Sequence, residues 1–414
     1  MVASPDPMHG GVLIEQDKFS LLPTAAVYGA NASGKSNLLK AVEAMRDFVL
    51  YSATGMNVGD SIPNMIPFRL DEDWRKRPSC FEIEAIVDET CYIYGFSATP
   101  DKVTSESLSI RRAGGRTVNR FRRDTDARTG NTKWSFRGLS KKDEKLLREK
   151  TRENGLLLSR AAELNFEEFG ELYLWFHQGL RCFDLSDPPR YLMKQTASKA
   201  QKDVKFKERV LRMLRDADFG IQNILVKDRP LSPPDGIPED LKSALANLLA
   251  SSPDNTWNVA VQTTHFDGEN KPVAFSLEHD ESNGTQRFFS LAGPIIEALD
   301  SGATIVVDEL ECSMHPLLTR KIIELFLSRE ANPSGAQLIF STHDSSLLDH
   351  TLFRRDQIWI AEKTQSGATE LFSLHDFDGG AKPRKDEAFQ RKYLSGRYGG
   401  VPKFGPTFED LEVR

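Results

Sequence analysis

The chain has 414 residues, of which 39% are hydrophobic and 28% charged, and these proportions exclude a disordered or fibrous protein. At roughly 100 to 200 residues per domain, this length predicts two or three domains, or one large α/β unit with insertions. No apolar run approaches the ~20 residues that cross a bilayer. The first ten residues lack the features of a secretion signal, so we expect a cytoplasmic protein.

The net charge of −6 is unevenly distributed, since residues 101–152 contain 16 Lys or Arg against 7 Asp or Glu. A basic region on an acidic protein indicates a surface for a polyanion or for an acidic partner. A solvated helical insertion explains the same charges equally well. No aromatic residues are regularly interleaved with the charges, which weakens the nucleic-acid interpretation. The four scattered cysteines, without CxxC spacing, favour buried thiols in a reducing compartment over disulfides or zinc.

The first half of the chain begins with a strand, a loop and a helix. Residues 24–28 form an apolar β-type run that ends in a glycine loop, and residues 36–50 have apolar side chains at helical spacing. Alternation over residues 81–98 predicts a hairpin that turns near Asp88 and Glu89.

The middle of the chain has helical patterns. Residues 140–160 are charged and helical, residues 161–183 predict an amphipathic helix, and residues 199–217 predict another. We therefore expect a helical insertion here. Prolines between residues 230 and 238 then mark a loop before a short helix at 241–249.

The last part of the chain alternates strands and helices. We expect strands at 257–266, 272–278, 304–307 and 337–340, with helices at 285–299 and 317–327. Continuous apolar strands in such alternation predict a parallel sheet that is covered on both faces.

A phosphate-binding motif follows the first of these strands and opens the helix, as GxxxxGK[ST] requires. Its glycines let backbone N–H groups face phosphate oxygens, and the helix N-terminus adds its positive dipole end. We expect Lys35 to reach the β and γ phosphates and Ser36 to ligate Mg²⁺. The residues predicted to bind the nucleotide here are Gly29, Asn31, Ala32, Ser33, Gly34, Lys35, Ser36 and Asn37.

Two adjacent carboxylates, Asp308 and Glu309, end the apolar strand that begins at Thr304. At that position one acid holds Mg²⁺ and the other polarises an attacking water, so we assign the metal to Asp308 and catalysis to Glu309.

Two further polar segments complete the candidate site. The strand at 337–340 delivers His343 to the same edge of the sheet, where it could hydrogen-bond the γ-phosphate as a second catalytic residue. Ser282 and Gly284 lie in a small polar loop that opens a helix, which is a weaker signal for an anion site.

By type and order, these four elements resemble the nucleotide-binding domain of the ABC ATPase superfamily. Residues 29–37, 284–287, 308–316, 341–344 and 393–399 are similar to the stand-alone prokaryotic ABC-type ATPases of the OLD (overcoming lysogenization defect) group. The resemblance implies an α/β fold: an ABC-ATPase-like P-loop domain with a mostly parallel core sheet, an antiparallel β element and a helical insertion. On this basis we divide the chain into four parts. They are an N-terminal lobe (1–135), the helical insertion (136–220), a C-terminal lobe (221–378) and a tail (379–414).

The resemblance also implies an activity and partners. In ABC-type domains the signature loop of one subunit caps ATP on the P-loop of another, so Ser282 and Gly284 are expected to face a partner's γ-phosphate. The resemblance therefore implies a homodimer or higher homo-oligomer that hydrolyses ATP with Mg²⁺. Members of the OLD group are often encoded beside a nuclease-like or toxic effector in anti-phage or abortive-infection systems. This implies a sensor or scaffold that controls a separate effector from the same operon, without a membrane partner.

Other functions remain open. One is a DNA-maintenance ATPase related to the SMC-type repair proteins, although residues 150–220 show no sustained heptads of a long coiled coil. Another is an assembly scaffold that binds ATP without significant turnover, against which the intact Glu309 argues. A small-molecule P-loop kinase is disfavoured because it needs neither the Asp308–Glu309 pair nor His343.

Overall fold

The computed structural model describes residues 1–5, 13–16, 19–185, 190–228, 241, 259–379, 383–384 and 387–402. The predicted loop at 230–238 lies outside these residues, as does the short helix predicted at 241–249 beyond its first position.

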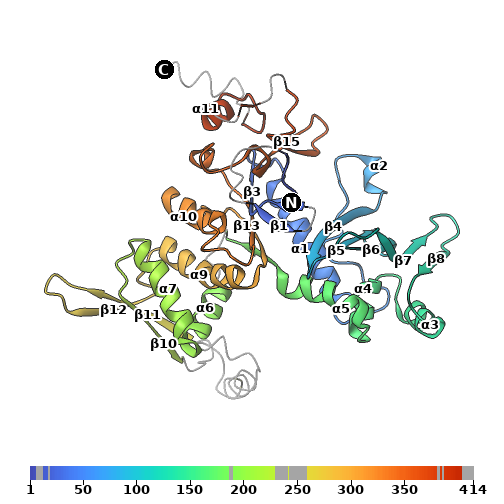
Figure 1. Ribbon diagram of the computed structural model, residues 1–414, viewed down its shortest axis with the longest axis horizontal. Helices are drawn as coiled ribbons and strands as arrows, with labels where there is room; N and C mark the ends of the chain where they lie inside the picture. Colours follow the sequence, from blue (N-terminus) through green and yellow to red (C-terminus); the bar gives the residue numbers. More distant parts are fainter. Residues whose placement is uncertain are drawn as a thin grey trace.

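A six-stranded sheet forms the centre of the molecule (Figure 1). Its first neighbouring pair is antiparallel and the other four pairs are parallel. In spatial order its strands are β16 (Thr369–Ser373), β15 (Ile358–Lys363), β3 (Thr24–Tyr28), β14 (Gln337–Ser341), β13 (Thr304–Asp308) and β9 (Leu180–Asp184). This order confirms the predicted α/β class with a mostly parallel core sheet.

Helices cover the sheet from both sides, as continuous apolar strands require. Ile305 and Val307 of β13 join a core that includes residues of α9 (Asn283–Ser301) and α10 (Pro316–Leu327). Val306, between them, belongs to a second core that includes residues of α1 (Lys35–Tyr51). Because successive strand residues face opposite sides, these two cores lie on the two faces of the sheet.

A five-stranded antiparallel sheet packs beside α1 and contains the predicted hairpin. Asp88 and Glu89 turn between its first two strands with φ of 44° and 63°, values typical of a tight hairpin turn. Its strands are β4 (Ser79–Val87), β5 (Thr90–Ala98), β6 (Val103–Arg112), β7 (Val118–Thr125) and β8 (Thr132–Phe136). The basic region therefore forms β6, β7 and β8 before it reaches α3, so its interpretation as a helical insertion is wrong for residues 103–136.

The long helix predicted at residues 161–183 is wrong at its end. The chain forms α3 (Lys141–Lys150), α4 (Leu157–Glu163) and α5 (Glu167–Leu174), then a π-helical turn (Trp175–Gly179) and β9. Parallel pairing of β9 with β13 outweighs the helical pattern, and the guanidinium of Arg46 donates to the carbonyl of Leu180 at 2.8 Å. A strand of the central sheet therefore lies within the segment expected to be helical.

The single helix predicted at residues 199–217 is divided in two. α6 (Arg190–Lys202) ends before Asp203, whose carboxylate accepts a hydrogen bond from the backbone N–H of Phe206 at 3.1 Å. This N-cap starts α7 (Val204–Asp216).

The remaining elements surround this framework (Figure 1). They include a three-stranded antiparallel sheet of β10 (Asn223–Asp228), β11 (Val259–Phe266) and β12 (Pro272–Ser276), a two-stranded sheet of β1 (Ile14–Gln16) and β2 (Phe19–Leu21), the short helices α2 (Glu72–Arg75) and α11 (Phe389–Leu394), and 3₁₀ turns at Ser345–Leu347 and Arg355–Gln357. Within the described parts of the chain, no helix combines the length and apolar character needed to cross a membrane.

Candidate nucleotide-binding site

A cleft of about 1060 Å³ opens beside the carboxyl ends of β3, β13 and β14. Three separate parts of the chain enclose it: the phosphate-binding loop with the residues after β13 and β14, the segment before and within α2, and the turn between β15 and β16. The lining residues are Asn31, Ala32, Ser33, Gly34, Lys35, Ser36, Asn37, Phe68, Leu70, Asp71, Trp74, Glu309, His343, Lys363, Ser366, Gly367, Ala368 and Thr369.

Close packing requires glycine at two positions of the phosphate-binding loop. A Cβ on Gly29 would lie 2.4 Å from the carbonyl oxygen of Ala361, and a Cβ on Gly34 would lie 2.1 Å from Oγ1 of Thr369. Gly34 also has a φ of +103°. It forms the N-cap of α1, whose first turn has neither a side-chain cap nor an acidic residue. The N-terminal N–H groups of α1 are therefore available to an anion.

Lys35 is held inside this loop. Its Nζ donates hydrogen bonds to the carbonyls of Gly29 at 2.8 Å and Ala30 at 3.1 Å, and the residue is 5% exposed. Burial lowers the pKa of Lys35, while the neighbouring carboxylates of Asp308 and Glu309 oppose that effect. The predicted phosphate ligand and the two predicted acids thus lie close together.

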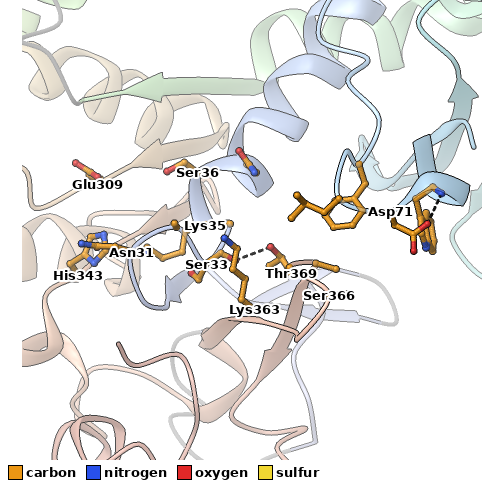
Figure 2. A pocket seen from close by; sticks show the side chains of 18 residues that line it. Asn31, Ser33, Lys35, Ser36, Asp71, Glu309, His343, Lys363, Ser366 and Thr369 are labelled. Carbon is orange, nitrogen blue, oxygen red and sulfur yellow. Dashed lines mark hydrogen bonds between the residues drawn. The ribbon is translucent and has the colours of Figure 1, made fainter. Parts of the chain in front are cut away.

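The turn between β15 and β16 contacts the phosphate-binding loop and supports it. The sequence alone did not predict this contact. Oγ1 of Thr369 donates to the carbonyl of Ser33 at 2.8 Å (Figure 2). The buried hydroxyl of Ser33 has no hydrogen-bond partner among the described residues. A signal was present in the sequence, since residues 358–361 form an apolar run that precedes a turn with Gly367.

Ser341, for which the sequence predicts no role, fixes the two acids at the end of β13. Its hydroxyl donates to Oδ1 of Asp308 and accepts from the backbone N–H of Glu309, the latter at 2.9 Å. Asp308 is 9% exposed and is not among the residues that line the cleft, whereas Glu309 lines it. Glu309 also has a φ of +52°, an uncommon backbone conformation for glutamate that directs its side chain differently from a continuing strand.

His343 lies with Glu309 at one end of the cleft (Figure 2). Its side chain is exposed, and its backbone N–H donates to Oε1 of Glu311 at 2.6 Å. The structure therefore brings together the P-loop, Glu309 and His343, as the sequence predicts.

Ser282 and Gly284 lie elsewhere, at the N-terminus of α9. Ser282 is exposed, and its hydroxyl caps the helix by accepting from the backbone N–H of Thr285 at 3.1 Å. A Cβ on Gly284 would lie 2.5 Å from the carbonyl oxygen of Ser313, so this loop packs against the segment that follows Glu309. Neither residue is among those that line the cleft of the same chain.

The donor set fits a magnesium nucleotide. The described residues contain no group of three or more His, Cys, Asp or Glu that could hold a metal. Mg²⁺ does not require such a group, because it is usually bound by one or two carboxylates together with substrate phosphates and water. Ser36 and Asp308 remain the predicted ligands.

The basic region contains both structural and exposed cations. Arg123 is buried and lies 2.9 Å from the carboxylate of Glu106, and Arg120 pairs with Glu168. The exposed Lys and Arg residues of the region are Arg112, Arg116, Arg122, Arg128, Lys133, Arg137, Lys141, Lys142, Lys145, Arg148 and Lys150.

The expectation of buried thiols fails at one cysteine, because Cys80 is exposed.

The fold and the cleft define a P-loop protein of the α/β class. Residues 25–349 match the family described as "AAA domain, putative AbiEii toxin, Type IV TA system", and the chain belongs to this family of P-loop ATPases. No curated protein matches the chain.

Several solved structures are similar over most of their length. An SMC head bound to the C-terminal winged-helix domain of ScpA is 11% identical, with a TM-score of 0.37 over 86% of this chain and 92% of that one. The SMC head from Thermotoga maritima is 14% identical, with a TM-score of 0.34 over 87% and 95%. The recombination mediator RecF with ATP is 14% identical, with a TM-score of 0.28 over 87% and 95%.

Proposed function

We propose that the chain binds and hydrolyses ATP in the P-loop cleft. One observation carries this proposal: the uncapped N-terminus of α1, the ammonium of Lys35 and the side chains of Glu309 and His343 meet in one cleft. The helix N-terminus and Lys35 bind anions, and Glu309 and His343 can accept or donate a proton beside the bound phosphates.

Each residue then has a distinct role. The backbone N–H groups at the start of α1 and Lys35 bind the phosphates. Glu309 accepts the proton of the attacking water, and His343 hydrogen-bonds the γ-phosphate. Ser36 and Asp308 would hold Mg²⁺, which would supply positive charge beside the phosphate oxygens.

We further propose that the complete site forms between subunits. Ser282 is exposed, and neither it nor Gly284 is among the residues lining its own cleft, so both are available to the P-loop of another copy. A loop that opens the 19-residue helix α9 can bind an anion there. A homodimer or higher homo-oligomer would then hold ATP at each interface.

The biological role that we propose is control of a separate effector in an anti-phage defence system, in the cytoplasm. The resemblance to the OLD group supports it, and so does the toxin named in the description of the family. The effector would be a nuclease-like protein or a toxin from the same operon, released or reset by ATP turnover.

Measurements of ATP turnover and of mass in solution test the biochemical part of the proposal. Both the wild type and Glu309→Gln are measured with and without ATP. We expect the wild type to hydrolyse ATP and the Gln variant to accumulate as an ATP-bound dimer or larger assembly. Binding and assembly without turnover in the wild type would instead identify a scaffold. If neither protein hydrolyses ATP or changes mass, the proposal fails.

A second candidate function is an ATPase of DNA maintenance, which the exposed cations of β7, β8 and α3 favour. Phosphate contacts make duplex binding strongly salt-dependent. Lys142→Glu with Lys145→Glu should then abolish duplex binding, and Arg329→Glu, an exposed cation outside the region, should not. Equal binding by all three proteins would exclude this surface.

A further inference from the structure

The cleft extends beyond the phosphate-binding loop, away from the catalytic side chains. Figure 2 shows Glu309 and His343 at one end and Asp71 at the other, with Lys35 between them. The lining residues from the segment of Asp71 are chemically unlike those of the loop, since Phe68, Leu70 and Trp74 are apolar or aromatic. A charged phosphate chain does not bind favourably to an apolar or aromatic surface.

This apolar end is exposed although its backbone is fixed. Leu70 is 68% exposed and Trp74 is 52% exposed. Oδ1 of Asp71 accepts from the backbone N–H groups of Asp73 at 2.9 Å and Trp74 at 3.0 Å, which starts α2. A Cβ on Gly367 would lie 2.5 Å from Cδ1 of Leu70, so the turn between β15 and β16 touches this segment. The cap of α2 and the contact with the turn between β15 and β16 therefore hold this segment in place.

Trp74 offers an aromatic surface to the cleft. The guanidinium of Arg77 lies 4.6 Å from the centre of the indole and covers part of it, and Arg77 is not among the residues that line the cleft. Trp74 is nevertheless half exposed and lines the cleft, so part of its ring surface is open to a planar ligand. Stacking of a nucleobase on such a ring stabilises binding and tolerates any base.

Asp71 adds a means of selecting among bases. Both of its capping hydrogen bonds use Oδ1, and Oδ2 has no donor among the described residues. Asp71 itself lines the cleft. A carboxylate oxygen accepts hydrogen bonds only, so it favours a base that presents an amino group at this point.

We propose that this end of the cleft binds the nucleobase, which stacks on Trp74 beside Phe68 and Leu70 while Oδ2 of Asp71 accepts a hydrogen bond from the amino group of adenine. The inference rests on the proposed function, because the phosphates of the same nucleotide must occupy the P-loop. It assigns the preference for adenine to residues that follow α1 in the chain.

Calorimetric titration with Mg-ATP and with Mg-tripolyphosphate tests the stacking surface. Trp74→Ala should weaken ATP binding about 5- to 150-fold, the range measured for loss of one stacked base, and leave tripolyphosphate binding unchanged. Ile66→Ala is the matched control, since Ile66 is 63% exposed in the same segment but is not among the residues lining the cleft. Unchanged ATP binding in Trp74→Ala, or equal weakening for both ligands, would overturn the proposal.

Titration with ATP and with inosine triphosphate, which has an oxygen in place of the amino group, tests Asp71. Asp71→Asn keeps an oxygen for the two capping hydrogen bonds, so the fold should persist and the new NH₂ group should face the base. We expect the preference of the wild type for ATP to fall at least about tenfold or to reverse, as loss of one hydrogen bond to a charged group implies. Asp73→Asn, on the same helix, should retain the preference. The same preference in Asp71→Asn and the wild type would refute the role of Asp71.

The two proposals fail differently. A wild type that binds neither ATP nor tripolyphosphate refutes the P-loop function together with the base site. A wild type that binds both equally well, with Trp74→Ala unchanged, refutes the base site alone.

Discussion

A single hydroxyl controls the positions of both acids at the end of β13. Ser341 lies on the neighbouring strand β14, and it bonds the carboxylate of Asp308 and the backbone of Glu309 at once. Because Glu309 has a left-handed backbone conformation, this contact also helps to hold an unfavourable geometry. Ser341 is therefore a positioning residue in the proposed mechanism.

Ser341→Ala should lower ATP turnover at saturating ATP about 10- to 100-fold, a range typical of residues that orient metal ligands. Ser341→Thr keeps the hydroxyl and should recover most of the activity. Ser334→Ala, which removes a hydroxyl that donates to the carbonyl of Asp300 outside the cleft, is the control for fold. Wild-type turnover in Ser341→Ala would show that the acids need no such support.

The difference between the residues that were predicted and those that were missed is physical. Lys35, Glu309 and His343 each follow a strand in a recognisable local pattern, so sequence alone could place them at one edge of the sheet. Ser341 and Thr369 act across the sheet on residues far away in the chain, and no local pattern reports such contacts. Trp74 was missed because α2 has only four residues, which is too short for a periodic pattern to identify an exposed aromatic side chain.

At the level of elements, an ion pair fastens α10 to the segment after β14. The guanidinium of Arg320 lies 2.9 Å from Asp349, which also accepts hydrogen bonds from the backbone and the hydroxyl of Thr351. Burial raises the pKa of Asp349, but the hydrogen bonds from Thr351 and Arg320 outweigh it and lower the pKa to about 2. The ionised carboxylate is therefore the form that stabilises the fold.

Asp349→Asn should lower the free energy of unfolding by about 1 to 2 kcal/mol at neutral pH. A depressed pKa contributes stability that is fully present above the ordinary value near 3.8 and is lost as the pH falls towards about 2. The difference between variant and wild type should thus shrink between pH 4 and pH 2 in urea unfolding, with the exposed Asp378→Asn as control. A difference that is constant with pH would assign the loss to packing.

The elements that were predicted correctly are those whose own pattern determines them. β3, β13 and β14 are short apolar runs between turn residues, and α1 and α10 have clear apolar faces. The pairing of β9 with β13 could not be predicted, because its partner comes more than a hundred residues later and its own residues continue a helical pattern. The hairpin of β15 and β16 is different, because its two strands are neighbours in the chain and the turn with Gly367 was a local signal for it.

At the scale of the whole molecule, the described chain has one P-loop cleft and one signature-like loop, at separate places. The cleft lies beside the carboxyl ends of the central strands, and the loop opens α9, which precedes β13 in the chain. Contact of Gly284 with Ser313 fixes the loop to its own subunit. In the proposed function, the two features that act on one nucleotide come from two copies of the chain.

Complementation between two inactive variants tests this sharing. Lys35→Ala removes the phosphate ligand but leaves the signature-like loop intact. Ser282→Asp keeps an N-cap for α9 and places a negative charge where we expect the partner's γ-phosphate. Each variant alone should lack turnover, whereas Ser282→Asn, a neutral cap, should remain active.

In a mixture of the two variants, each mixed dimer has one site with an intact P-loop and an intact opposing loop, and one site with both defects. Random pairing makes about half of the dimers mixed, so a twofold-symmetric assembly should recover roughly a quarter of wild-type turnover. If each chain instead formed its own complete site, mixing would add nothing to the activities of the separate variants. Recovery of turnover on mixing would therefore show that the subunits share the nucleotide.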